Sequence, residues 1–553
     1  MSAGPRPARR SSPSPSSASS SCATARSRAG PTTSTRPACS NTSPRSRTSR
    51  ATSPASPLRP PDRPTHRVLG GGSVSDLLID GRLRRATGGR SYPNVNPATE
   101  EPIGEAADAA AEDLDAAVGA ARRAFDATDW STNADFRARC LRQLREALHK
   151  EKETLRTVTV QEAGVPVALT RSIWLDTVLD APAYWADLAV NYPYERDLGV
   201  GDTFAGVPAR RKILREPVGV VAAITPWNYP LPLNLFKLVG ALAAGCTVVL
   251  KPAPDTPWSG TELGRLVAEH TDIPAGVVNV ISGRDPGLGA GLVADPRVDM
   301  VTFTGSTATG RTIMASAAEQ LKRVCLELGG KSANIVLDDA DFPAVVGAAV
   351  SVCAHAGQGC ALPTRMLLPR SRYDEGVSIA TASFESVSAG DPTDPAVIVG
   401  PLINAAQRER VLGYIEKGKS EARLVVGGTP SPRPKGYYVE PTLFADVDPK
   451  AVIAQEEIFG PVLSLIPYED DDDAVRIAND SVYGLSGSVH SADLDRATAV
   501  AHRIRAGTIS VNDGVWFAPD APFGGYKQSG LGREFGDEGF GEFLETKTLG
   551  LPA

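Results

Sequence analysis

The chain has 553 residues, and its 42% hydrophobic and 22% charged residues are typical of a globular protein with two to four domains. The net charge of −6 is unevenly distributed. Residues 1–61 carry ten arginines and no acidic residue, which leaves 48 basic against 64 acidic residues in the rest. A body this acidic disfavours a nucleic-acid partner. Because Asn234 and Lys237 interrupt the longest apolar stretch, residues 231–250, we expect no membrane interaction.

The seven cysteines are odd in number and show no CxxC spacing, which favours a reducing compartment over a disulfide framework. The same scattered arrangement disfavours a structural zinc site, and we expect no bound metal. Together with the absence of an apolar span, this predicts a soluble, cytoplasmic protein.

Residues 1–72 are rich in Ser, Pro and Arg and poor in large apolar side chains, so we expect a disordered tail. Two interpretations stay open. The tail resembles an organellar transit peptide, and it equally resembles translation from a start upstream of the true one. Neither interpretation gives this segment a part in the fold.

Folded sequence is expected to begin near residue 76 with a short strand and turn, followed by helices over 109–125 and 134–157. From residue 217 onward, buried strands alternate with helices. The strands are predicted at 219–224, 246–250, 277–281 and 300–303, and the helices at 231–244 and 259–269. This alternation predicts an open parallel sheet with binding sites at the carboxyl ends of its strands. The glycine-rich residues 287–291 are predicted to form a surface loop.

A second α/β segment is expected after Gly330, with its own sheet. Its strands are predicted at 334–337, 365–369 and 462–467, and its helices at 342–355, 405–418 and 472–479. The tail, residues 543–551, is typical of an edge strand, and edge strands seek partners. We expect it to pair with residues 194–216 of a neighbouring subunit.

Two residues suggest covalent chemistry on a carbonyl group. Cys360 lies in a turn of small residues, and Glu327 lies before two glycines, thirty-three positions upstream. A cysteine thiolate is a nucleophile, and a nearby carboxylate can activate a water molecule. Because leucines flank Glu327 on both sides, we expect a partly buried carboxylate with a raised pKa. Residues 225–228, 251 and 304–306 follow predicted strand ends, where a dinucleotide would bind.

Six stretches, in order and spacing, identify the chain from about residue 76 onward as similar to the aldehyde dehydrogenase superfamily. They are Thr225–Leu231, Phe303–Thr307, Leu326–Ser332, Gly357–Cys360, Glu456–Pro461 and Pro522–Gly530. The resemblance implies an α/β fold with a Rossmann-type cofactor domain, an α/β catalytic domain and a β oligomerisation arm. It assigns residues 73–195 and 216–329 to the NAD(P)-binding domain, 330–530 to the catalytic domain, and 196–215 and 531–553 to oligomerisation.

The resemblance implies an NAD(P)-dependent, non-acylating enzyme. Cys360 would add to the aldehyde carbon, and the Asn228 amide with the Cys360 N–H would hold the resulting oxyanion. After hydride transfer, Glu327 would activate the water that hydrolyses the thioester. Lys237 would belong to the same proton path.

The implied cofactor-binding residues lie at strand ends and in two later motifs. They are Ile224, Thr225, Pro226, Trp227, Lys251, Gly305, Ser306, Leu328, Glu457 and Phe459. Lys251 would bind ribose hydroxyls or a 2′-phosphate, and Ser306 would begin a helix that faces the pyrophosphate. Pro254 stands where NAD-preferring relatives carry a glutamate, so NAD is expected and NADP stays open, with Asp255 as a substitute from a shifted position.

Five aromatic residues are expected near the substrate channel, which predicts an apolar or aromatic aldehyde: Tyr229, Phe236, Trp516, Phe517 and Phe523. Asp513 and Asp520 leave a cationic aminoaldehyde, of the betaine-aldehyde type, as an alternative. A coenzyme A-acylating enzyme is disfavoured by Glu327. A non-catalytic scaffold is disfavoured because Cys360, Glu327 and Asn228 are all present. We expect a homodimer or homotetramer.

Overall fold

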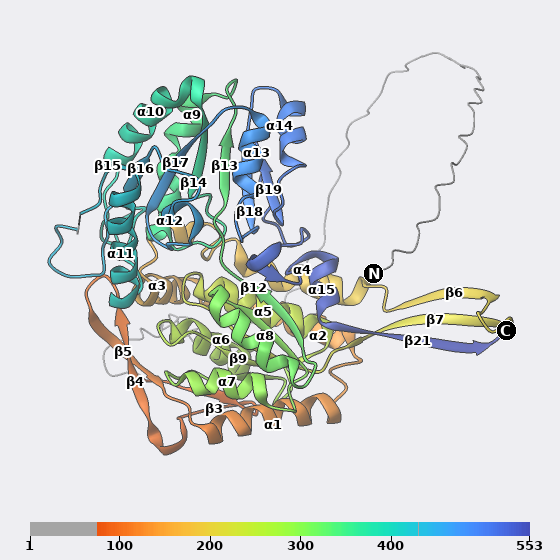
Figure 1. Cartoon of the computed structure of the whole chain (residues 1–553). Coiled ribbons are helices and arrows are strands. Elements are labelled where there is room, and N and C mark those ends of the chain that lie inside the picture. Colours follow the sequence, from red (N-terminus) through yellow and green to blue (C-terminus); the bar gives the residue numbers. More distant parts are fainter. Residues whose placement is uncertain (1–73, 430) are drawn as a thin grey trace, which may run out of the picture. The chain divides into compact units, whose positions relative to one another are not determined.

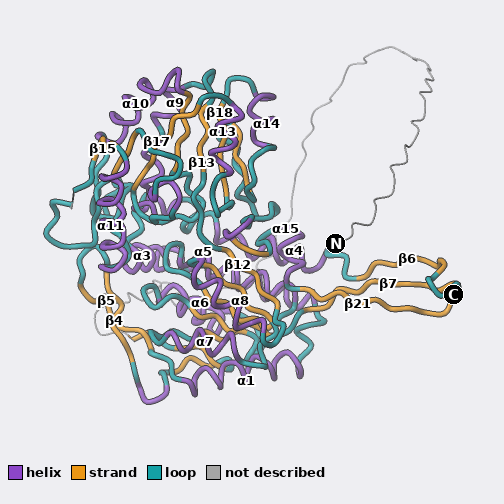
Figure 2. Tube along the Cα trace, in the orientation of Figure 1, coloured by secondary structure: helices purple, strands orange, loops and turns teal. Residues whose placement is uncertain are grey.

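The computed structural model describes residues 74–429 and 431–553, and the tail predicted at 1–72 lies outside these residues. Within the described part, one sheet of eight strands and one of seven form two separate α/β halves, and three further strands project away from them (Figure 1). Figure 2 shows helices on the flanks of the strands in both halves.

The eight-stranded sheet has the order β20-β12-β11-β8-β9-β10-β2-β3. Its strands are β2 (Leu77–Ile79), β3 (Arg82–Arg84), β8 (Val220–Ile224), β9 (Thr247–Lys251), β10 (Val278–Val280), β11 (Met300–Thr304), β12 (Arg323–Glu327) and β20 (Gly530–Leu531). The five central strands are parallel, and β2 and β20 pair antiparallel at either side. Central strands β8 and β9 consist almost entirely of buried Val, Ala and Leu, as a parallel sheet covered on both faces requires.

Within residues 74–327 of the described chain, eight helices belong to this half. They are α1 (Ala111–Ala127), α2 (Ala134–Lys150), α3 (Lys152–Ala163), α4 (Ala181–Asn191), α5 (Pro230–Ala244), α6 (Pro257–His270), α7 (Pro286–Ala294) and α8 (Thr307–Ala318). Two predictions were wrong here. The single helix over 134–157 is two helices that meet at Glu151, a residue with non-helical φ and ψ. The predicted loop at 287–291 lies inside α7, which Asp285 caps through the Gly287 N–H.

The seven-stranded sheet has the order β15-β16-β17-β14-β13-β18-β19. Its strands are β13 (Ala333–Val336), β14 (Arg365–Pro369), β15 (Arg423–Val426), β16 (Thr442–Ala445), β17 (Val462–Tyr468), β18 (Ser486–His490) and β19 (Thr508–Val511). Its helices are α9 (Phe342–Gly347), α10 (Tyr373–Glu385), α11 (Ala405–Glu421), α12 (Val452–Gln455), α13 (Asp471–Asn479) and α14 (Leu494–Ala501). The chain passes from the first sheet to the second between β12 and β13.

The helix predicted over 342–355 ends early, at Gly347. A 3₁₀ segment, Ala349–Gly357, replaces its second half. Within that segment His355, Ala356 and Gly357 adopt left-handed φ values of 51°, 55° and 70°. The left-handed run turns the chain sharply just before Cys360.

Three further strands form an antiparallel arm of β6 (Glu195–Asp202), β7 (Pro208–Pro217) and β21 (Leu544–Pro552), in the order β21-β7-β6. The prediction that the tail strand pairs with a neighbouring subunit was wrong, because β21 pairs with β7 of its own chain over nine residues. A further backbone hydrogen bond lies next to this ladder. Phe543 accepts a hydrogen bond from the Val218 N–H (2.9 Å), which brings the start of β21 beside the end of β7.

The predicted domain boundary at residue 530 also needs correction. Gly530–Leu531 (β20) returns to the first sheet and pairs with β12, although the sequence placed residue 530 in the catalytic domain. The next helix, α15 (Gly536–Glu542), packs on the first half through Phe540. Only β21 therefore extends into the arm. A second sheet of three strands, β1 (Val74–Ser75), β4 (Ser91–Asn96) and β5 (Glu101–Ala107), lies beside the first half.

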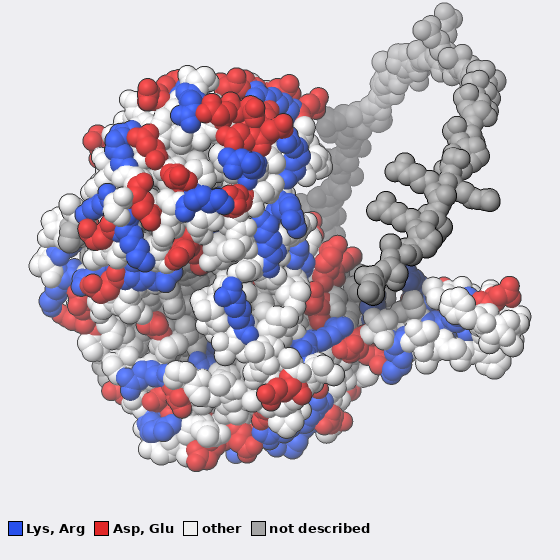
Figure 3. All heavy atoms as spheres, in the orientation of Figure 1, with Lys and Arg blue, Asp and Glu red and all other residues white. Residues whose placement is uncertain are grey.

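Charged side chains of both signs alternate over the face drawn in Figure 3. Among the described residues, no helix is long and apolar enough to cross a membrane.

Phe540 offers a test of how α15 is held. Its ring is fully buried, with centroids 6.0 Å from Trp185 and 4.7 Å from Tyr192. We expect Phe540→Ala to lower the free energy of unfolding by about 3–5 kcal/mol, because truncation leaves a cavity among aromatic rings. Denaturant titration measures the change. Leu549→Ala, at an exposed position on β21, is the matched control, and an equal loss in both variants would contradict this packing.

Candidate active site

Cys360 is partly exposed, whereas the other four cysteines in the described part of the chain are buried. Its loop packs tightly on both sides. A Cβ added to Gly357 would lie 2.1 Å from the Gly460 carbonyl oxygen, and one added to Gly330 would lie 2.5 Å from that of Cys360. Burial raises the pKa of the Cys360 thiol well above its usual range, and the charges of Glu327 and Glu457 raise it further. The thiol therefore rests protonated until a positive charge or a base comes near.

Gln358 fixes the turn that precedes Cys360. Its side-chain NH₂ donates to the carbonyl oxygens of His355 (3.1 Å) and Pro401 (3.3 Å), and its side-chain oxygen accepts from the Ile403 N–H (2.9 Å). The Gln358 carbonyl oxygen accepts from the Asn228 side-chain NH₂ at 2.9 Å. Asn228 is buried beside the loop, and its second amide hydrogen stays available for a substrate oxygen.

Glu327 ends β12 with only 2% of its surface exposed. Neither carboxylate oxygen has a hydrogen-bond partner within the described residues. Burial raises its pKa well above the ordinary value, as does the negative charge of Glu534, while Lys237 opposes the rise. An unpartnered buried carboxylate is costly, and such perturbed groups cluster at functional sites. The predicted raised pKa is confirmed.

Lys237 lies on α5 and is buried almost completely. Its Nζ donates to Glu534 Oε1 at 2.5 Å and to Thr302 Oγ1 at 3.1 Å. Sequence reasoning missed Glu534. A buried lysine signals that an acidic partner is needed, but this partner is 297 positions away, and no local pattern identifies it.

Four predicted residues end neighbouring strands at one edge of the first sheet. Thr304 pairs with Glu327, and Ile224 pairs with Lys251, in two parallel ladders of the same sheet. The Thr225 N–H extends the second ladder by donating to the Lys251 carbonyl oxygen at 3.2 Å. Parallel alignment thus brings the predicted cofactor residues of β8 and β9 to the same edge of the sheet as the end of β12.

The helix after β11 faces the same edge. Ser306 caps α8 by accepting from the Thr309 N–H at 3.2 Å, so the positive end of the helix dipole lies there. Gly305 is confined, since an added Cβ would lie 2.4 Å from the Phe303 ring. Leu328 is buried against α8, where a Cβ on Gly310 would meet it at 2.6 Å. A helix terminus of this kind suits a pyrophosphate.

Glu457 and Phe459 approach from the second half of the molecule. Glu457 Oε1 accepts from the Gly330 N–H at 2.9 Å, and burial raises the pKa of this carboxyl to about 7. The Phe459 ring meets Trp227 edge to face, with centroids 5.4 Å apart, and Pro226 precedes Trp227 in the chain. These contacts bring predicted residues of both halves together.

Helix α11 supports this segment through two residues that sequence reasoning missed. Gln407 donates to the Phe459 carbonyl oxygen at 2.9 Å, and Arg410 donates to that of Glu457 at 2.7 Å. Both residues lie one turn apart on one helix face, but their targets are backbone atoms, which leave no trace in a sequence.

The residues after β9 bear on the coenzyme. Lys251 is buried, and burial lowers the pKa of its amine. Pro254 is half-buried nearby in the chain. Asp255 accepts from the Asn404 side-chain NH₂ at 3.0 Å, so one of its oxygens is already engaged. A substitute role for Asp255 is weakened by that contact.

An apolar cavity of about 290 Å³ lies between α4, α5 and the segment around residue 518. Phe236 and Phe517 line it, together with Phe535. Trp516 and Phe523 stack on each other behind Phe517, with centroids 5.4 Å apart, so they support the wall. Tyr229 stacks instead on Trp174 at 4.9 Å. The predicted aromatic residues thus divide between lining and support.

The sequence matches the model of the aldehyde dehydrogenase family over residues 84–549. It is 43% identical over 485 residues to a 3-succinoylsemialdehyde-pyridine dehydrogenase of a Pseudomonas species. This match covers 86% of this chain and 98% of the relative. It is 44% identical over 464 residues to the geranial dehydrogenase of Castellaniella defragrans, which covers 83% and 94%.

Solved structures agree. An aldehyde dehydrogenase from Mycobacterium tuberculosis complexed with NAD+ is 43% identical, with a TM-score of 0.83 and coverage of 87% of this chain and 99% of the other. A mutant of aldehyde dehydrogenase C from Pseudomonas syringae, complexed with NAD+ and octanal, is 41% identical, with a TM-score of 0.81 and coverage of 86% and 96%. This chain belongs to the aldehyde dehydrogenase family.

Proposed function

We propose that this protein oxidises an aldehyde to a carboxylic acid with NAD+, through a thioester on Cys360 that a water activated by Glu327 hydrolyses. The observation that carries the proposal is Glu327, a buried carboxylate without a hydrogen-bond partner in the described chain. Its charge acts on the thiol of Cys360, the one cysteine of the described chain that is partly exposed. An acylating enzyme or a scaffold has no use for such a carboxylate.

In the first step the deprotonated Cys360 thiolate forms a bond from Sγ to the aldehyde carbon, and the carbonyl electron pair moves onto oxygen. The free amide hydrogen of Asn228 and the Cys360 N–H stabilise that oxyanion, at about 3 kcal/mol for each donor. Bound NAD+ supplies the hydride acceptor. Return of the oxyanion electron pair re-forms the C=O bond, the hydride leaves, and a thioester remains on Cys360.

Glu327 then accepts a proton from water as the water oxygen attacks the thioester carbon. The C–S bond breaks, the thiolate returns and the carboxylic acid departs. The proton can pass from Glu327 toward the Lys237–Glu534 pair, whose charges already bear on the Glu327 pKa. Lys237 is thus assigned to proton movement.

The cofactor site fits NAD in the same proposal. The edge formed by Ile224, Thr225 and Lys251 would hold the adenosine half, and the α8 terminus at Gly305 and Ser306 would hold the pyrophosphate. Glu457 offers a carboxylate to the nicotinamide ribose, between Leu328 on one side and Phe459 on the other. NADP stays an alternative, because Pro254 brings no carboxylate to repel a 2′-phosphate.

The substrate is proposed to be an apolar aldehyde, aliphatic or aromatic. The cavity beside Phe236 and Phe517 is apolar, and relatives are named for geranial and crystallised with octanal. A cationic aminoaldehyde is disfavoured, because Asp513 lines a different cavity and Asp520 lines neither.

The arm is proposed to assemble the protein as a homodimer or homotetramer. Strands β6 and β21 are its two edges, and no strand of the described chain pairs with their outer sides. Val200, Phe204 and Val207 are exposed on it. Unpaired edges with apolar side chains seek a partner.

Two variants separate the chemical steps. We expect Cys360→Ala to abolish oxidation, and Glu327→Gln to keep a single-turnover burst of NADH while slowing the steady state at least about 100-fold. Stopped-flow absorbance at saturating NAD+ measures both phases. Glu319→Gln, at an exposed position, is the control. Parental turnover in Glu327→Gln would refute the assigned base.

The pH dependence of thioester hydrolysis tests the proton path. Glu327 acts only when ionised, so hydrolysis should rise with pH through its raised pKa. Glu534→Gln removes a charge that raises this pKa and should move the rise to lower pH. Lys237→Met removes a positive charge that lowers the Glu327 pKa and should move the rise to higher pH. Steady-state rates from pH 5 to 10 measure the midpoint, with Lys212→Met on the arm as control. Shifts of the same sign would contradict the arrangement.

Pro254→Glu tests the coenzyme site. A carboxylate there should accept a ribose hydrogen bond and repel a 2′-phosphate, which lowers kcat/KM for NADP relative to NAD at least about tenfold. Initial rates with each coenzyme give the ratio, and Asp255→Asn serves for comparison. An unchanged ratio would mean that the ribose lies elsewhere.

A further inference from the structure

A second cavity, of about 320 Å³, lies on the far side of the Cys360 loop. Its walls come from α9, the following 3₁₀ segment and strands β13, β18 and β19, and Ala361, the residue after the nucleophile, reaches it. It shares no lining residue with the apolar cavity at Phe236. The proposed oxidation uses none of the polar side chains that line it.

His490 lines this cavity with a side chain that is about 95% buried. Within the described residues its imidazole makes no hydrogen bond, and its closest charged neighbour is Asp513, with Nδ1 4.0 Å from Oδ1. Burial lowers the His490 pKa, so the ring is neutral near pH 7. The ring thus adds a polar surface to the wall of the cavity, close to Asp513.

The other polar groups present acceptors. Ser488 Oγ donates to Asn334 Oδ1 at 2.9 Å, and Ser510 Oγ donates to the Gly514 carbonyl oxygen at 2.8 Å. With their hydrogens engaged, both hydroxyls offer lone pairs to the cavity. The Asp513 carboxylate, whose side chain is 88% exposed, adds a negative charge at the solvent side of the cavity, and the Trp516 indole adds an aromatic wall. Acceptors, one negative charge and an indole suit a cation that carries hydrogen-bond donors.

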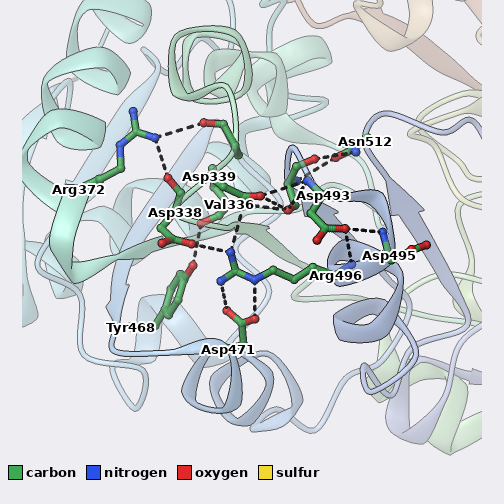
Figure 4. Close-up of polar contacts among 12 residues, drawn as sticks. Val336, Asp338, Asp339, Arg372, Tyr468, Asp471, Asp493, Asp495, Arg496 and Asn512 are labelled. Atoms are coloured by element: carbon green, nitrogen blue, oxygen red, sulfur yellow. Dashed lines mark hydrogen bonds and ion pairs between the residues drawn. The ribbon is translucent and has the colours of Figure 1, made fainter.

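The backbone before Asp513 is fixed by its neighbours. Asn512 and Asp513 have left-handed φ values of 46° and 60°, which Asn and Asp adopt more readily than other residues with a side chain. Asn512 exchanges two hydrogen bonds with the Ser491 backbone, at 3.0 and 2.9 Å. Figure 4 shows this residue beside the network in which Arg496 binds Asp339 and Asp471. These contacts fix the position from which the exposed Asp513 side chain extends.

We propose that this cavity binds a small organic ammonium ion, with its charge toward Asp513, its N–H groups toward Ser488 and Ser510, and its alkyl chain against Trp516. The volume is far larger than an inorganic ion needs and suits a short alkylamine. This site is distinct from the substrate site and does not depend on the proposed oxidation.

Calorimetric titration of the Cys360→Ala chain, without aldehyde, tests the proposal with three probes of equal length: n-butylammonium, 1-butanol and butyrate. We expect saturable binding of n-butylammonium and at least about tenfold weaker binding of the other two. Asp513→Asn should weaken n-butylammonium at least about tenfold. Ala348→Trp, which places a bulky side chain on the exposed rim, should abolish it.

Asp520→Asn is the matched control, since Asp520 is exposed nearby in the chain but does not line the cavity, and it should bind like the parent. NAD+ binding by each variant reports that it is folded. Equal affinity for 1-butanol and n-butylammonium, n-butylammonium affinity unchanged by Asp513→Asn and Ala348→Trp, or no binding at all would each overturn the proposal. Because the titrated chain lacks the nucleophile, failure of the oxidation proposal leaves this result intact.

Discussion

One hydrogen bond, from the Asn228 side chain to the Gln358 carbonyl oxygen, connects the two halves of the protein next to the nucleophile. Asn228 follows a strand of the first sheet, and Gln358 belongs to the loop that enters the second. Each partner is itself fixed. Asn228 precedes a buried helix, and Gln358 binds three backbone groups of its own half. The bond therefore sets the distance between an amide donor and the Cys360 thiol, on which an oxyanion site depends.

The electrostatics of the site follow from the close approach of the two halves around Cys360. Three carboxyl groups, on Glu327, Glu457 and Glu534, lie within reach of one thiol, and each of their charges raises its pKa. The positive charge of Lys237, which forms an ion pair with Glu534, offsets part of that negative charge. Such a site is unfavourable for a thiolate, because three carboxyl groups surround it. In the proposed mechanism, the positive charge of an oxidised nicotinamide ring would offset this effect.

Sequence patterns located the buried strands well, because continuous apolar runs between turns have few alternatives: the strand predicted at 365–369 coincides with β14. Helix ends were less predictable. The apolar pattern over 342–355 continues past Gly347, but the backbone there follows the needs of the Cys360 turn, which no periodicity records. The break at Glu151 lies in a stretch of good helix formers, where no sequence pattern indicates it.

Residue motifs identified the proposed nucleophile, the proposed base and the strand-end residues, since each is tied to a local turn or strand end. What they could not place were partners set by tertiary contact alone. Glu534 pairs with Lys237 across the fold, β21 finds its own β7, and Asp513 faces a cavity away from the apolar one. In each case the chain neighbours of the residue say nothing about the surface it meets.

The packing around Gly357 and Gly330 has a mechanical consequence. The Gly460 carbonyl leaves no room for a methyl group at Gly357, and the Cys360 carbonyl leaves none at Gly330. The Glu457 carboxylate accepts a hydrogen bond from the Gly330 N–H. Three segments that are distant in sequence therefore pack against one another with no space for an added side-chain atom. A displacement of Glu457 would therefore be transmitted through the Gly330 backbone to the backbone of Cys360.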